Sequence, residues 1–173
     1  MLSELKNKKY NFVDIDYPIG DFLEYNLDDE IMLDDTQALQ RDYVWNLVQK
    51  QEFILSIIYG RFIPNFVSII TYIGTKKIVK IIDGKQRLSA IKGFVNDEFK
   101  ITINDVDYLF SELTHTDKIY FLSQDIVVSR IVDYNNTLTI NDYIDIFLLF
   151  NYSGTVMEKE YFENLKKFKN NLK

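Results

Sequence analysis

A buried strand that passes through Asp-Gly directly into a helix is the feature of this sequence that most limits its fold. The β-branched run at 78–82 is followed by Asp83-Gly84, and helical periodicity starts at Gln86. The backbone N–H groups of a first helical turn lack partners within the helix, and the helix dipole favours anions there. The junction therefore predicts a fold of mixed strands and helices with a turn suited to phosphate, although a plain structural turn has the same local pattern.

Short elements of both kinds surround this junction. Glycine and proline after residue 59 are expected to end an amphipathic helix whose apolar stripe is Val48, Phe53, Ile54, Ile57 and Ile58. Thr114 and Thr139 are expected to cap helices. The predicted helices are 18–25, 45–59, 86–95, 117–122, 140–150 and 156–172, and the predicted strands are 31–33, 66–73, 77–82, 99–103, 106–110 and 125–132, with turns at Asp34-Asp35-Thr36, Gly74-Thr75 and Asn104-Asp105. This order predicts an α+β fold, a small mixed sheet with surrounding helices.

Length and composition set broad limits. A chain of 173 residues suits one domain over 1–173, with a loose N-terminal segment at 1–12 and a C-terminal helix at 156–173. No apolar run is long enough to span a membrane and no signal peptide is recognisable, so we expect a cytoplasmic protein. Cysteine is absent and His115 is the one histidine, which excludes disulfides, thiolate metal sites and histidine clusters. His115 itself is expected to be structural or exposed.

Charge is distributed unevenly along the chain. The net charge is −6, and residues 1–35 hold ten acidic side chains against three lysines. Strong direct binding to DNA needs a positive face, so the composition argues against it. The acidic segment is interpreted as a solvated face, with a contact surface for a basic partner or an imitation of nucleic acid as the alternatives.

Three motifs lie in a fixed order, and together they resemble a known family. They are Gln40-Arg41-x-Tyr43-x-Trp45, then Gly60 with Ile63-Pro64, then Ile82-Asp83-Gly84-x-Gln86-Arg87-Leu88. A late segment, Phe147 to Thr155 with Glu158 and Glu160, fits the same pattern. From Ile31 to Glu160 the sequence resembles the GmrSD N-terminal domain family of the ParB/sulfiredoxin-like group.

The resemblance implies a ParB/sulfiredoxin-like fold and a role in defence against foreign DNA. Domains of this family resemble nucleotide-hydrolysing modules that drive a separate His-Asn-His nuclease. One histidine cannot build that nuclease, so we expect a stand-alone module whose nuclease, if any, lies on another polypeptide. The predicted function is a nucleotide-binding and NTP-hydrolysing regulatory module of a restriction or phage-defence system. The alternative is a non-enzymatic phage or bacterial protein that engages a nucleotide or a defence protein through the same pocket or its acidic face.

Four residues are the candidate catalytic group. Asp83 could bind Mg²⁺ or orient water, or it could simply cap the helix. Arg87 could grip phosphate with its planar fork, or it could pair with a carboxylate at the core edge. The resemblance adds Gln86 and places Arg41 near both, which would suit the phosphates of a nucleoside triphosphate.

Further residues are candidate nucleotide contacts. Tyr43 and Trp45 could stack on a base, although aromatic residues in such places more often belong to the core. Lys85 departs from the family, which has a second glutamine there; it could hold phosphate or face solvent, and it leaves the hydrolytic step open. The predicted nucleotide-binding set is Gln40, Tyr43, Gly84, Lys85 and Asn151. The sequence leaves open the nucleotide, the partner protein and the oligomeric state.

Overall fold

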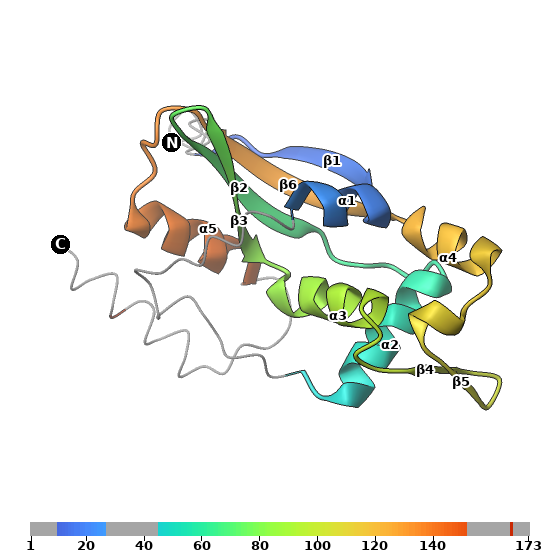
Figure 1. The fold of residues 1–173 in the computed structure, drawn as a ribbon. Coiled ribbons are helices and arrows are strands. Elements are labelled where there is room, and N and C mark those ends of the chain that lie inside the picture. The colour runs from blue at the N-terminus through green and yellow to red at the C-terminus, as the bar shows by residue number, and fades with distance from the viewer. Residues whose placement is uncertain (1–9, 27–44, 152–166, 168–173) are drawn as a thin grey trace.

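A mixed four-stranded sheet organises the molecule (Figure 1). The computed structural model describes residues 10–26, 45–151 and 167. The strands β1 (Val13–Pro18), β2 (Phe66–Ile73), β3 (Lys76–Asp83) and β6 (Asp125–Asp133) lie in the order β1-β6-β2-β3. The β1–β6 and β2–β3 pairs are antiparallel, whereas β2 and β6 are parallel. Helices combined with a mixed sheet confirm the predicted α+β class.

The helices and a second, two-stranded sheet complete the described fold. Figure 1 shows α2, α3, α4 and the small sheet gathered at the end of the large sheet where β3 passes into α3. The helices are α1 (Ile19–Asn26), α2 (Leu47–Ile58), α3 (Lys85–Val95), α4 (His115–Leu122) and α5 (Ile140–Asn151), the small sheet is β4 (Ile101–Ile103) with β5 (Val106–Tyr108), and Phe110–Glu112 form a 3-10 turn, η2. No helix in these described ranges is both long and apolar enough to cross a membrane.

Local signals predicted most of these elements. Thr114 caps α4 by accepting a hydrogen bond from the Asp117 backbone N–H, and Thr139 and Asp142 make reciprocal backbone contacts at the start of α5. Asn104 and Asp105 both have positive φ, as a two-residue turn between β4 and β5 requires. His115 is exposed in the first turn of α4, as expected.

Two expectations for the first half of the chain were wrong. The strand β1 was not predicted, because it is a short edge strand whose alternating pattern ends at Pro18, and Pro18 belongs to the strand rather than to the helix. Val48 is 62% exposed instead of buried. Asn46 caps α2 and the helix starts only at Leu47, so its first turn lies beyond the core. The predicted elements at 31–33, 34–36 and 156–172 lie outside the described residues.

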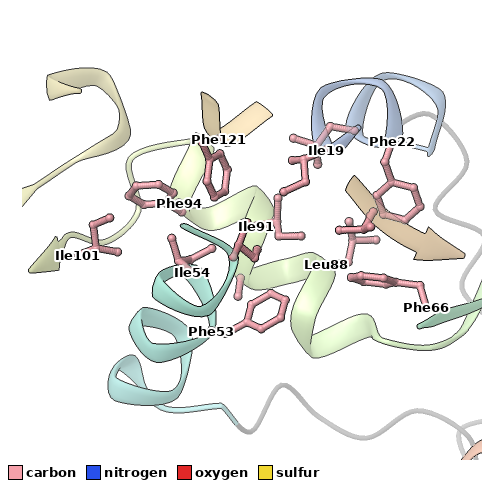
Figure 2. Packing of buried hydrophobic residues seen from close by; sticks show 14 of the residues in the cluster. Ile19, Phe22, Phe53, Ile54, Phe66, Leu88, Ile91, Phe94, Ile101 and Phe121 are labelled. Atoms are coloured by element: carbon pink, nitrogen blue, oxygen red, sulfur yellow. The ribbon is translucent and has the colours of Figure 1, made fainter. Parts of the chain in front are cut away.

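Two apolar clusters cover the two faces of the sheet. The first joins α1, α2, α3 and α4 to Phe66, Ile126 and Val128. Figure 2 shows side chains of the helices and Phe66 packed together. The second packs α5 against Val67 and Ile69 on the opposite face. Because successive strand residues point to opposite faces, neighbours such as Phe66 and Val67 belong to different clusters. At the end of β3, Ile81 likewise packs against the first cluster and Ile82 belongs to the second, so apolar contacts hold this strand end on both faces.

Candidate functional site

The turn between β3 and α3 is built around Gly84. Asp83 ends the strand and Gly84 is the N-cap of α3, with φ +101°. A Cβ at Gly84 would lie 2.5 Å from Cδ1 of Phe66, a contact that real side chains do not make. Only glycine fits both the backbone conformation and the space, so the backbone comes close to the Phe66 ring.

The N-terminus of α3 differs from the other described helix starts that have caps. Gly84 supplies no side-chain hydrogen bond, whereas Asn46 caps α2 and Thr114 caps α4. The Leu88 backbone N–H bonds the Gly84 carbonyl at 2.8 Å, which starts the helical ladder. The positive end of the helix dipole therefore lies beside Asp83 without a capping side chain.

Arg87 is held firmly beside this turn. Its Nη2 lies 2.7 Å from Oδ2 of Asp83, and the guanidinium lies over the Phe66 ring, 4.8 Å from the centroid. It also donates to the carbonyl of Pro64, and both Nη atoms lie 3.4 Å from the carbonyl of Asn65. The Arg87 residue is only 9% exposed. Burial lowers the pKa of Arg87, and the attraction of Asp83 partly offsets that effect.

Asp83, the carbonyls of Pro64 and Asn65 and the Phe66 ring form a cradle around Arg87. A chain of hydrogen bonds connects this cradle to strands β6 and β1. Asn65, whose carbonyl accepts from Arg87, donates through Nδ2 to Oγ of Ser129 at 3.1 Å. Ser129 in turn donates to Oδ1 of Asp14 at 2.5 Å. The position of Arg87 thus depends on β6 and β1 as well as on the strand that precedes it.

Gln86 joins the first and third motifs. Its Oε1 accepts from the Trp45 backbone N–H at 3.3 Å, so the last residue of the Gln40–Trp45 motif lies at the first turn of α3. The Trp45 ring packs on Phe53 with centroids 5.4 Å apart and is partly buried against the first cluster. Its contacts support the core interpretation over base stacking.

The structure brings together part of the predicted site. Asp83, Gly84, Lys85, Gln86 and Arg87 share one turn, and both Lys85 and Gln86 are partly buried. The residues Gln40, Arg41 and Tyr43 lie outside the described part, and so does the side chain of Asn151, the last residue of α5. No group of three or more carboxylates or histidines suited to a metal occurs within the described ranges.

The residues that position Arg87 were missed. Pro64 and Asn65 contribute backbone carbonyls, and Phe66 contributes the face of its ring. Pro64 was noted only as part of a motif, and a backbone acceptor has no signal in the sequence. Asp83 remains 30% exposed at its side chain and only its Oδ2 bonds Arg87, so a fixed carboxylate stays accessible beside the helix start.

The chain belongs to the family of the GmrSD restriction endonuclease N-terminal domain, whose family model matches residues 19–173. The match includes the whole β3–α3 turn. No curated protein and no solved structure matched the chain. Membership of the family points to a module of a restriction and phage-defence system.

Proposed function

We propose that this protein is a nucleotide-binding regulatory module of a DNA restriction and phage-defence system, with the nucleotide phosphates at the first turn of α3. The observation that carries the proposal is the helix start itself: it has no side-chain cap and follows Asp83 through a glycine. Backbone N–H groups at such a start, with the helix dipole, form a common phosphate site.

The neighbouring side chains support this ligand. Gly84 is the N-cap of α3 and brings no side chain of its own to the helix start. Lys85 and Gln86 stand in the first turn, and the ammonium of Lys85 adds positive charge there. Gln40, Tyr43 and Asn151 are proposed as further nucleotide contacts on the strength of the family resemblance.

Asp83 fits a magnesium ion only as part of a metal–nucleotide complex. Mg²⁺ usually takes one or two carboxylates, and phosphate oxygens and water complete its octahedron. One Asp83 oxygen bonds Arg87, which leaves the other for such an ion. When bound, Mg²⁺ would neutralise phosphate charge.

Beyond nucleotide binding, we propose that the site hydrolyses the bound nucleotide. Asp83 would orient the attacking water, with Gln86 and Arg41 assisting at the phosphates. Arg87 lies against three acceptors and an aromatic ring, so its part is to position Asp83. That same observation favours the alternative function, a module that binds nucleotide without turnover, because a buried and engaged arginine does not reach a transferred phosphoryl group.

Calorimetry and phosphate release separate these functions. The full chain is titrated with ATP, GTP, CTP and UTP in the presence of Mg²⁺, and released phosphate is measured. Asp83→Asn keeps an acceptor for Arg87 but removes the charge, so release should fall about a hundredfold. The matched control is Asp107→Asn in the β4–β5 hairpin, where Asp107 accepts from Thr102 at 2.7 Å away from the turn.

Each outcome has one meaning. Release that Asp83→Asn loses and Asp107→Asn keeps supports hydrolysis. Tight nucleotide binding without release supports the binding module. Absence of binding to all four nucleotides overturns the phosphate site at α3.

A further inference from the structure

A second site lies on the sheet face that bears α1. A cavity of about 290 Å³ opens there, and every strand of the large sheet contributes to its wall. Arg130 of β6 and Lys77 of β3 stand on this face with Ser68 of β2 and Tyr17 of β1. Lys77 lies at the start of β3, at the other end of that strand from Asp83 and the turn into α3.

The cationic groups of this cavity have no counter-charge among the described residues. Among residues 10–26 and 45–151, neither Arg130 nor Lys77 has a carboxylate within ion-pair distance. Arg130 makes a single hydrogen bond there, from Nη1 to the Tyr17 hydroxyl at 2.7 Å, and its buried Nε has no acceptor. Arg130 is partly buried, and a buried donor such as its Nε is costly to leave without an acceptor, a cost that a bound anion would remove.

Two hydroxyl groups add to the polar wall. Ser68 is only 2% exposed and lines the cavity. The Tyr17 hydroxyl accepts from Arg130, so its own hydrogen is available to a ligand. Two positive charges and two hydroxyls match the double charge and several oxygens of a phosphate monoester better than the single charge of a carboxylate.

The rest of the cavity is apolar. Ile70, Val79 and Val128 line its floor between the polar side chains, and Phe22 of α1 stands at its wall. Figure 2 places Phe22 next to Phe66, and the two ring centroids lie 5.3 Å apart. An aromatic wall over an aliphatic floor suits a planar ring, and the volume lies at the lower limit for small-ligand pockets.

We infer that this cavity binds a small phosphate monoester with a planar or apolar body, at a site separate from the α3 turn. Arg130 and Lys77 hold the phosphate, Ser68 and Tyr17 donate to its oxygens, and the ring lies against Phe22. The inference does not depend on the proposed function, because none of these residues belongs to the β3–α3 turn.

Phenyl phosphate and inorganic phosphate are the probes, titrated into the full chain by calorimetry. Phenyl phosphate should bind more tightly than inorganic phosphate, because only the ester fills the apolar part. Arg130→Gln and Lys77→Gln should each weaken phenyl phosphate at least about tenfold. Lys80→Gln is the matched control: it removes the same charge from β3 on the opposite face, where Lys80 lies over the Tyr143 ring.

Circular dichroism of each variant checks that it is folded, and Lys77→Gln on the edge strand keeps the test valid if Arg130→Gln unfolds. Retained binding in Lys80→Gln and in Lys85→Gln, which removes the positive charge at the α3 turn, with loss in the two cavity variants, supports the site. Three results overturn it: no binding of phenyl phosphate at millimolar concentration, equal affinity for both probes, or loss in Lys85→Gln with binding kept in Lys77→Gln.

Discussion

Replacing Gly84 with alanine tests the geometry on which the site is built. The substitution adds a single methyl group, but it meets two obstacles. The φ of +101° strains any residue with a Cβ, and the new Cβ would stand 2.5 Å from a carbon of the Phe66 ring. Phe66 is fully buried, so its ring cannot move aside into solvent.

These two effects determine how much the free energy of unfolding of Gly84→Ala falls. Backbone strain of this kind costs about 1–3 kcal/mol, and forcing an extra methyl into a packed core costs about 1–3 kcal/mol. Together they remove about 2–6 kcal/mol from a total that is typically about 5–15 kcal/mol. For a chain of this length that corresponds to a melting temperature lower by about 4–24 °C.

Gly60→Ala is the matched control. Gly60 also has a positive φ, +62°, but no atom lies within 4 Å of the position its Cβ would take. The Gly60→Ala variant should therefore lose only the free energy that backbone strain costs, about 1–2 kcal/mol. Urea unfolding followed by circular dichroism and by the fluorescence of Trp45, the single tryptophan, measures both variants.

Two results would refute this reasoning. One is a Gly84→Ala loss within about 0.5 kcal/mol of the Gly60→Ala loss, since the steric contribution would then be absent. The other concerns Phe66→Leu, which shortens the group that the new methyl meets. The double variant should be less destabilised than the sum of the two single variants, and simple additivity would show that the clash does not exist.

Two further predictions concern buried charges. Arg87→Met leaves Asp83 and the carbonyls of Pro64 and Asn65 without their donor, so the free energy of unfolding should fall by about 3 kcal/mol. Arg87→Lys should restore only part of this stability. If urea unfolding shows that Arg87→Met loses less than about 0.5 kcal/mol, the contacts of Arg87 do not stabilise the fold. Burial raises the pKa of Asp133, but backbone N–H groups of the turn after β6 outweigh it and the net pKa is lowered. Stabilisation by a lowered carboxyl pKa is complete above the unfolded value, near pH 3.9, and disappears as the pH falls through the folded pKa. Asp133→Asn should therefore cost about 1–3 kcal/mol at pH 7 and progressively less below about pH 4, and a pH-independent difference in urea titrations would be evidence against it.

The elements with strong local signals were predictable from the sequence. The β2–β3 hairpin has β-branched residues on either side of Gly74, and α2 ends at a glycine with positive φ. The parallel pairing of β2 with β6 was not predictable, because β-branched composition favours a strand but does not specify the strand with which it pairs. Strand β1 was missed although its apolar residues alternate with Asp14 and Asp16, because it is short, ends at Pro18 and pairs along one edge only.

The side chains of the candidate site were predictable from the sequence, but the backbone groups that contact them were not. The four-residue spacing of Asp83 and Arg87 allows the ion pair that the structure contains. The sequence offered a salt bridge of Arg87 with a carboxylate at the core edge as the alternative to phosphate binding, but it did not name Asp83 as that carboxylate. The backbone carbonyls that complete the cradle can come from any residue type. Lys77 and Arg130 share a cavity through strand order alone, so neither could be singled out before the topology was known.

The strand order also fixes the sequence of events when the chain is synthesised. Strand β1 leaves the ribosome early, yet its partner in the sheet is β6, and Asp14 and Ser129 are 115 positions apart. The hairpin of β2 and β3 and the helix after it can form first from neighbouring residues, whereas β1 must wait. A nascent chain that stops before β6 can already hold the Asp83–Arg87 pair, but it has neither the Ser129 bond that steadies Asn65 nor the Tyr17–Arg130 contact. We therefore expect the α3 turn to form early in folding and the cavity to form late.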